Sequence, residues 1–200
     1  MITLLKKFLF VALVMIFFAA TASAESKPVR IARLPIIFQN TIPDADTCAE
    51  LETKIARAVH VPLNGTLQLV EYLPPKDSAE ILNNLWQEMR RKNKKVRLQD
   101  TMRPLAQKLD ADIIVCPILK KYIQHDLGLS GWEEAKISSH VITELIVYDR
   151  RTDELIDKKS AEMYNDSYMP HGTASFLANI CFNRVIDDTK IRQRIIAIRK

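Results

Sequence analysis

The chain has 200 residues, of which 48% are hydrophobic and 26% are charged, and it carries a net charge of +5 at pH 7. This composition excludes a disordered polar chain, and the length suits one domain with its own hydrophobic core. The positive charge is too small to indicate nucleic acid as a partner.

Residues 1–24 have the three parts of a secretory signal peptide. Two lysines precede an apolar run over residues 8–20, and small residues at 22–24 suit a signal peptidase. The run would span only about 20 Å as a helix, which is short of a hydrocarbon core of roughly 30 Å. We therefore expect cleavage to release residues 25–200 as an exported, soluble protein, periplasmic or extracellular. The two lysines are the only charged residues removed, so the net charge falls from +5 to about +3.

The first half of the mature chain alternates predicted strands and helices. Alternating polarity predicts a strand over residues 29–34. Thr47 and Glu50 have the spacing of a capping box for a helix over residues 48–60. Residues 67–73 then read as a second strand, which the pair Pro74-Pro75 ends.

Two more helices are predicted next. Asp77 with Glu80 is predicted to cap the first, whose apolar face holds Ile81, Leu82, Leu85, Trp86 and Met89. Asp100 or Thr101 is predicted to cap the second, with Pro104 in its first turn.

The second half is dominated by strands. Residues 113–119 are apolar in succession, which is typical of a central strand covered on both faces. Strands near 141–148 and 154–163 follow as an antiparallel meander, and a last helix is predicted over residues 173–188. The tail at about 190–200 is basic, with four interleaved isoleucines, so it could lie on a membrane or pack back on the domain.

These elements predict a single mixed α/β domain over residues 25–200, with the order β-α-β-α-α-β-β-β-α. The early crossovers favour parallel pairing, and the later hairpins impose antiparallel pairing. The expected fold is a mixed sheet that ends in an antiparallel meander and is packed by helices.

Three phrases of the chain resemble the exported α/β domains of the TolB amino-terminal and CsgG-like group, which includes lipoprotein activators of penicillin-binding proteins. They are the opening strand over residues 29–35, the helix-to-strand passage over residues 105–115, and the hairpin over residues 147–154. The chain departs from the group because it has no lipidation cysteine, no propeller and no evident pore-forming insertion. The resemblance implies a non-catalytic envelope domain that acts by contact with a protein or an envelope polymer.

Two local features are candidates for binding. The first is a cluster of six cations in eight positions, which could be a solvated helix end or a docking patch for an anionic surface. Its residues are Arg90, Arg91, Lys92, Lys94, Lys95 and Arg97. The second is Trp132, which ends the glycine-containing stretch over residues 127–132 and could be a contact point on an exposed loop or pack beneath that loop.

Three cysteines remain in the mature chain. Cys116 lies in an apolar run and is expected to be a core residue. Cys48 and Cys181 fall near the start of the first helix and within the last one, so an oxidising compartment would permit a bridge between them. A Cys181–His171 pair is the one nucleophile and base that folding could bring together.

The sequence therefore leads to three hypotheses. The first is an exported, non-catalytic interaction domain that binds an envelope protein or polymer. The second is a peripheral binder of anionic membrane surfaces that uses the basic clusters. The third is a hydrolase with a fold-assembled Cys and His site. No cofactor or metal is indicated, because no His-x-x-x-His, Cys-x-x-Cys or glycine-rich phosphate loop occurs.

Overall fold

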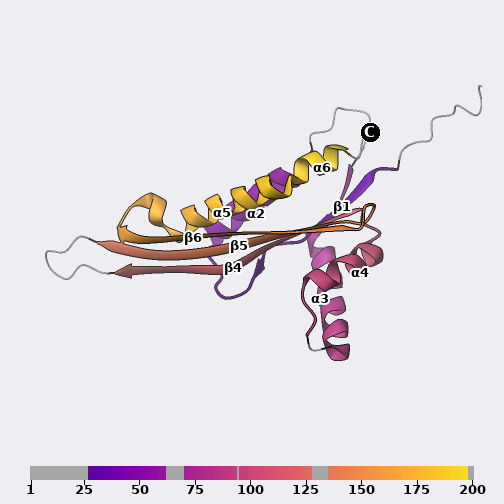
Figure 1. The fold of residues 1–200 in the computed structure, drawn as a ribbon, viewed down its shortest axis with the longest axis horizontal. Helices are drawn as coiled ribbons and strands as arrows, with labels where there is room; N and C mark the ends of the chain where they lie inside the picture. Colours follow the sequence, from indigo (N-terminus) through magenta and orange to yellow (C-terminus); the bar gives the residue numbers. More distant parts are fainter. Residues whose placement is uncertain (1–26, 62–69, 94, 128–134, 198–200) are drawn as a thin grey trace, which may run out of the picture.

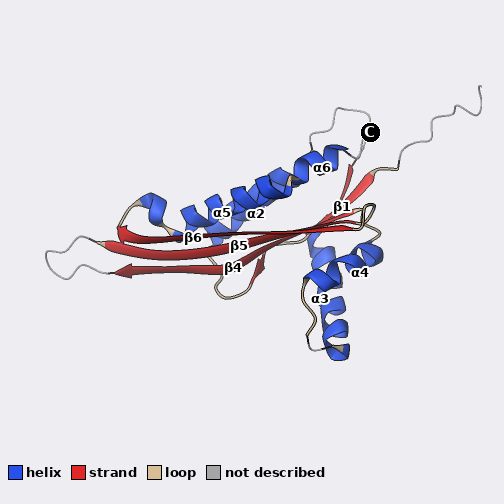
Figure 2. Ribbon diagram, viewed as in Figure 1, coloured by secondary structure: helices blue, strands red, loops and turns tan. Residues whose placement is uncertain are grey.

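A computed structural model of the chain describes residues 27–61, 70–93, 95–127 and 135–197 (Figure 1). The predicted signal peptide at residues 1–24 lies outside these ranges. The described elements alternate between strands and helices in the first half of the chain, and three long strands followed by helices form the second half (Figure 2). In chain order they are β1 (Val29–Arg33), β2 (Ile37–Phe38), α2 (Ala45–Val59), β3 (Val70–Leu73), α3 (Pro75–Lys92), α4 (Gln99–Leu109), β4 (Ile113–Leu127), β5 (Lys136–Asp149), β6 (Glu154–Ser167), the 3-10 turn η1 (Pro170–Gly172), α5 (Ala174–Thr189) and α6 (Ile191–Ala197).

The strands form one mixed sheet in the order β3-β1-β4-β5-β6, with β2 also paired to β4. β1 runs parallel to both β3 and β4, since helical crossovers return the chain in the same direction. β4, β5 and β6 are joined by hairpins and pair antiparallel. The predicted fold class, a mixed α/β domain with an antiparallel meander in its second half, is confirmed.

Helices cover the two faces of the sheet to different extents. On one face, α2, α5 and α6 enclose a core that includes Phe182, Leu51 and Ile195. On the other, α3 and α4 enclose a second core that includes Met102 and Leu105. Figure 1 shows α3 and α4 beside one end of the β4–β6 ribbon, while its far end extends away from them.

The burial pattern of β5 shows that helices cover both faces of only one half of the strand. Between Lys136 and Thr143 every second residue is buried, as in a strand with one face covered. From Glu144 to Asp149 every residue is buried, as in a strand covered on both faces. The far half of the ribbon therefore has one face without a helix.

The helix caps differ from the predicted ones. Asp44, not Thr47, caps α2, because its carboxylate accepts hydrogen bonds from the Thr47 backbone N–H and hydroxyl, both at 2.8 Å. α3 begins at Pro75 after Pro74, so the predicted cap Asp77 lies inside the first turn.

α4 begins at Gln99, before either predicted cap. Leu98 occupies the N-cap position, and its side chain makes no capping hydrogen bond. Asp100 instead accepts a hydrogen bond from the Arg97 backbone N–H at 2.9 Å, and the Thr101 hydroxyl donates to the Leu98 carbonyl.

The three strands of the meander are longer than predicted. β4 continues eight residues past the apolar run, to Leu127, after a bulge between Leu119 and Lys121. Beyond the bulge, residues 120–126 are half-buried or exposed and mostly polar, so the apolar run marked only the buried part of the strand.

The basic tail forms α6. Ile191 and Ile195 are buried, with 1% and 2% exposure, and they join the core beneath α2 and α5. Ile196 is 44% exposed. Of the two predicted arrangements of the tail, packing back on the domain is confirmed for these two buried isoleucines.

The cysteines are free thiols. Cys116 is fully buried in the second core, as predicted, and burial raises the pKa of its thiol. Cys181 is fully buried in α5, and Cys48 is half-buried in the first turn of α2. The bridge between Cys48 and Cys181 is not formed in this structure and stays a prediction.

Candidate functional site

A groove of about 380 Å³ lies between α3 and the segment that joins β1 to β2. Its walls are mainly apolar, with Gln39 and Asn83 as the polar side chains. The lining residues are Leu34, Pro35, Ile37 and Gln39 on one side, Ala79, Leu82, Asn83 and Trp86 on α3, and Leu98 before α4. Pockets of this size and composition are typical of sites that receive an apolar group of a ligand.

The spacing of residues along α3 explains the groove. Ala79, Leu82, Asn83 and Trp86 recur at intervals of three and four positions, so they share one face of the helix. The neighbouring face carries Leu85, which is buried in the second core. Trp86 was predicted as part of that buried face, but it is only half-buried and borders the groove.

Trp86 also borders the cationic end of α3. The Arg90 guanidinium lies over the indole ring, 5.6 Å from its centroid, which is a cation–π arrangement. Trp86, Gln87, Arg90 and Arg91 together line a shallow open pocket next to the groove. One aromatic side chain thus joins an apolar wall to a charged one.

The cations of this helix end divide into paired and unpaired ones. Lys92 pairs with Glu88 at 2.8 Å, and Arg97 pairs with Asp100 at 3.7 Å. The Lys92 hydrogen bond, the Lys92 charge and the Lys108 charge, in that order, lower the pKa of Glu88. Within the described ranges, no carboxylate lies within 4.0 Å of Arg90, Arg91 or Lys95. We call these three residues the free cations of α3.

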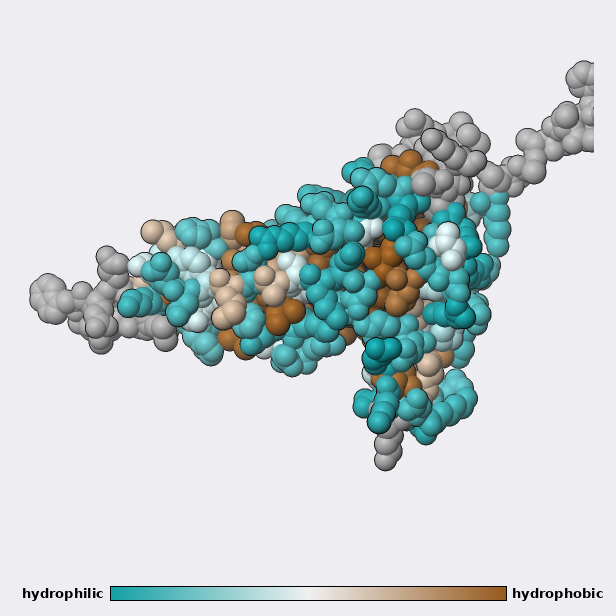
Figure 3. All heavy atoms as spheres, in the orientation of Figure 1, coloured by the Kyte–Doolittle hydropathy of each residue, from teal (hydrophilic) through white to brown (hydrophobic). Residues whose placement is uncertain are grey.

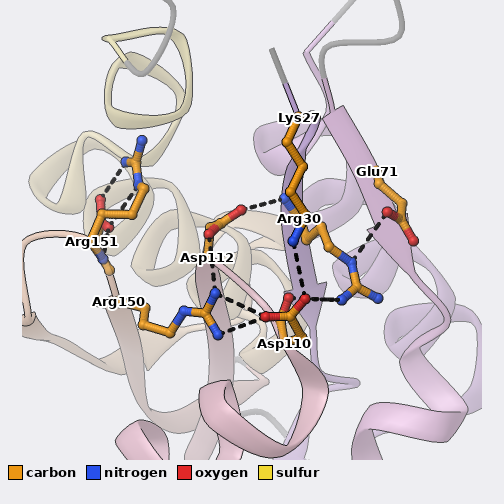
Figure 4. Close-up of polar contacts among 8 residues, drawn as sticks. Lys27, Arg30, Glu71, Asp110, Asp112, Arg150 and Arg151 are labelled. Atoms are coloured by element: carbon orange, nitrogen blue, oxygen red, sulfur yellow. Dashed lines mark hydrogen bonds and ion pairs between the residues drawn. The ribbon is translucent and has the colours of Figure 1, made fainter. Parts of the chain in front are cut away.

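A contrasting cluster of charges lies where β1, β4 and the β5–β6 turn meet (Figure 4). Asp110 Oδ1 accepts two hydrogen bonds from the Arg150 guanidinium, each at 3.0 Å, and Oδ2 pairs with Arg30 at 3.0 Å and Lys27 at 3.2 Å. Arg30 also pairs with Glu71 at 3.2 Å.

Asp112 completes this cluster, since its carboxylate accepts a hydrogen bond from the Arg30 backbone N–H and lies 3.7 Å from Arg150. Three cations thus face three carboxylates. The cluster compensates its own charge and ties strands together, whereas the free cations of α3 remain available to an external anion.

A buried polar network joins α4 to the sheet. Glu144 in β5 is 1% exposed and forms an ion pair with Lys120, while Lys159 lies 3.7 Å away. The Gln99 amide donates to Glu144 at 3.1 Å and to Asp157 at 2.9 Å. Because each carboxylate has its partners inside the protein, the network reads as a structural link between α4 and the ribbon.

The predicted Cys181 and His171 pair has unfavourable surroundings for nucleophilic chemistry. Cys181 is fully buried, and burial raises the pKa of its thiol, which disfavours the reactive thiolate. His171 is exposed and packs edge-on against Tyr164, with ring centroids 5.4 Å apart. No group of three metal-ligating side chains occurs within the described ranges.

Two of the predicted contact residues, Lys94 and Trp132, lie outside the described residues. Of the other predicted cations, Arg90, Arg91 and Lys92 lie in the last turn of α3, whereas Lys95 and Arg97 lie in the segment that follows it. The structure adds Trp86 and the groove, which sequence reasoning missed. The spacing of three and four positions from Ala79 to Trp86 could have predicted the α3 wall of the groove, because it places these residues on one face of the helix. The opposite wall carries no such signal, because it comes from residues about 50 positions earlier.

No helix in the described part of the chain is long and apolar enough to cross a membrane. No protein-family model matches the chain, and no curated protein matches it.

Several solved bacterial structures are similar to this chain at low identity. The hypothetical protein CT253 from Chlamydia trachomatis is 16% identical, with 84% of this chain and 95% of that chain covered and a TM-score of 0.41. Lipoprotein GNA1162 from Neisseria meningitidis is 13% identical, with 80% and 99% covered and a TM-score of 0.39. The LpoB C-terminal domain from Salmonella enterica is 10% identical, with 72% and 90% covered and a TM-score of 0.30.

The sheet and helices described above place this chain in the mixed α/β class. None of the three structures bears the name of the TolB or CsgG groups, so the predicted resemblance to those groups stays a prediction.

Proposed function

We propose that this chain is an exported domain of the bacterial cell envelope that acts by binding and performs no chemistry. Its binding surface is the groove beside α3 together with the free cations of that helix. The partner is a protein segment that presents an apolar side chain next to carboxylates.

One observation carries this proposal: Trp86 lines the apolar groove and also lies beneath Arg90 at the cationic helix end. An apolar side chain of a ligand would fill the groove and bury part of the indole surface. Carboxylates on either side of it would reach Arg90 and Arg91. Tryptophan and arginine are enriched among the residues that contribute most to binding at protein interfaces.

The chemistry of the groove favours a peptide over a bare anionic surface. A phosphate or sulfate group would meet the cations but would leave the apolar groove empty. Exposed cations each contribute up to about 1 kcal/mol to an ion pair, so charge alone gives weak binding that salt screens. The apolar anchor supplies the remaining affinity through burial, at about 25 cal/mol per Å².

Binding of synthetic peptides tests the proposal. The probe is a fluorescently labelled short peptide of Glu, Asp and Leu, titrated with the mature protein at low salt. Arg90→Glu/Arg91→Glu should weaken binding roughly tenfold, because reversal of two charges removes about 1–2 kcal/mol. Trp86→Ala should weaken it by a similar factor through loss of the apolar wall.

Matched controls test whether the loss of binding is specific to this surface or follows from any reversal of surface charge. Arg57→Glu/Arg192→Glu reverses the same number of charges at exposed positions of α2 and α6 and should leave peptide affinity unchanged. A peptide with Lys in place of Glu and Asp should not bind. If the protein ignores both peptides but binds vesicles that contain anionic lipid, the membrane hypothesis is correct instead.

Export requires its own measurement. We propose that residues 1–24 are removed, which predicts a secreted or periplasmic product whose intact mass corresponds to a chain that starts at Glu25. A product that retains Met1 and the apolar run would contradict export by cleavage.

A further inference from the structure

β6 ends the sheet, and among the described strands none pairs with its outer edge. The strand has 14 residues, and its pairing with β5 runs from Glu154 to Ser167 without a shift of register. Natural proteins usually shorten, bulge, charge or cover such an edge, because its free backbone groups are a template for another strand. β6 is neither short nor bulged, and its protection depends on charged side chains such as Lys158 and Lys159. A strand from another molecule could therefore pair with this edge if the side chains of the two strands are complementary.

The side chains along this edge are complementary to themselves. In an antiparallel pair of two β6 strands related by a twofold axis at Ser160, Lys158 lies opposite Glu162 of the second copy. Ile156 lies opposite Tyr164 in the same way. Symmetry forms each pair twice, and both opposite-charge and aliphatic–aromatic pairs stabilise antiparallel strands.

Other registers lose this complementarity. Twofold axes at residues 158, 159 or 162 each place a charged side chain opposite itself, and an axis at 161 forms no opposite-charge pair. Ser160 also lies at the middle of β6, so this register uses the whole strand. At its two ends Glu154 would face Asp166, and Arg194, which pairs with Glu154 at 2.8 Å, supplies the compensating cation.

The two charged groups are available for this pairing. Lys158 is exposed and, within the described ranges, has no carboxylate within 4.0 Å. Glu162 pairs with Arg184 of α5 and is partly exposed, so it can also receive a lysine from outside.

We infer that β6 pairs antiparallel with β6 of a second copy of this chain, and that the two sheets join into one. In the sheet order β6 lies three strands from β1, whose following segment lines the groove.

Zero-length cross-linking of the mature protein tests the register. Carbodiimide joins a lysine to a carboxylate only when they touch, and Lys158 and Glu162 of one strand are roughly 13 Å apart. A Lys158–Glu162 amide can therefore form only between two copies. We expect it in the dimer band on mass spectrometry, and a dimer band that contains only other cross-links would overturn the register.

Mass measurement in solution by light scattering tests the dimer itself. Lys158→Glu should shift the protein to monomer by placing carboxylates opposite each other. The triple variant Lys158→Glu/Glu162→Lys/Arg184→Glu exchanges all three charges and keeps every pair, so it should restore the dimer. Arg192→Glu, on the exposed side of α6, is the control and should remain dimeric.

Two results would overturn the inference. One is an unaltered chain that stays monomeric from dilute solution to its solubility limit. The other is a dimer that Lys158→Glu leaves intact. Neither outcome depends on peptide binding at α3, so failure here is distinguishable from failure of the proposed function.

Discussion

At the scale of single residues, Asp110 has two roles. Its backbone ends α4, and its carboxylate binds several cations. It ends α4 in the left-handed region, with φ 47°, a conformation that Asp and Asn tolerate better than most side chains. Hydrogen bonds from Arg150 first, then from Lys27 and the Lys27 charge, lower the pKa of its carboxyl from 3.8 to about 2. The cations around it come from two segments that are distant in the sequence, one with Lys27 and Arg30 and the other with Arg150.

The lowered pKa of Asp110 predicts a pH dependence of stability. The carboxylate contributes stability that is fully present above its unfolded pKa of 3.8 and is lost as the pH falls through about 2. Asp110→Asn keeps a side chain that tolerates this backbone and removes the charge. Urea unfolding at about pH 6 and about pH 2 should show a larger loss for the variant at the higher pH.

The comparison isolates Asp110 because all other carboxylates are present in both proteins. An equal loss of unfolding free energy at both pH values would mean that the charge of Asp110 contributes nothing.

At the scale of elements, α6 shows how packing decides between two predicted arrangements. Its isoleucines could have faced a lipid surface, but the helix turns Ile191 and Ile195 into the core and leaves Ile196 half-exposed. Pairs four positions apart share a helix face, and this spacing was visible in the sequence. Which surface receives that face was not visible, because α2 and α5 supply it.

Substitutions in α6 test this packing. Ile195→Ala should lower the free energy of unfolding by about 2–4 kcal/mol, because a buried aliphatic side chain leaves a cavity. Ile196→Ala, the matched control, should cost less than about 1 kcal/mol, since that side chain is already partly in water. Equal costs in chemical denaturation would show that Ile195 is not a core residue in solution.

Other elements differed from prediction for local reasons. Thr47 and Glu50 have the spacing of a capping box, but Asp44 caps the helix three residues earlier. The Thr47 backbone N–H donates its hydrogen bond to the Asp44 carboxylate. The apolar run after Ile113 predicted a strand correctly and understated its length, because periodicity weakens once one face meets water. Sequence thus predicts element type well here and boundaries less well.

At the scale of the whole molecule, cations that form ion pairs within the chain differ in role from cations that do not. We assign the paired ones to the stability of the fold and the free cations of α3 to binding. On the face drawn in Figure 3 the surface is mainly hydrophilic, with hydrophobic side chains in smaller patches. Many cations of the described chain take part in internal ion pairs, as Lys27, Arg30 and Arg150 do around Asp110. The free cations of α3 do not, and they adjoin an apolar groove. The cations were predictable from composition, whereas the groove depends on how β1 and α3 meet across the sheet.

Site-specific photo-cross-linking in cells that express the full chain tests the central claim most directly. A photoreactive residue replaces Asn83, which is exposed on the α3 wall of the groove, and a second variant carries it at Arg57 on α2. We predict a protein adduct from position 83 alone, with the attached peptide, identified by mass spectrometry, rich in Asp, Glu and apolar residues. A lipid adduct, or the same adducts from both positions, would contradict a groove built for an acidic protein segment.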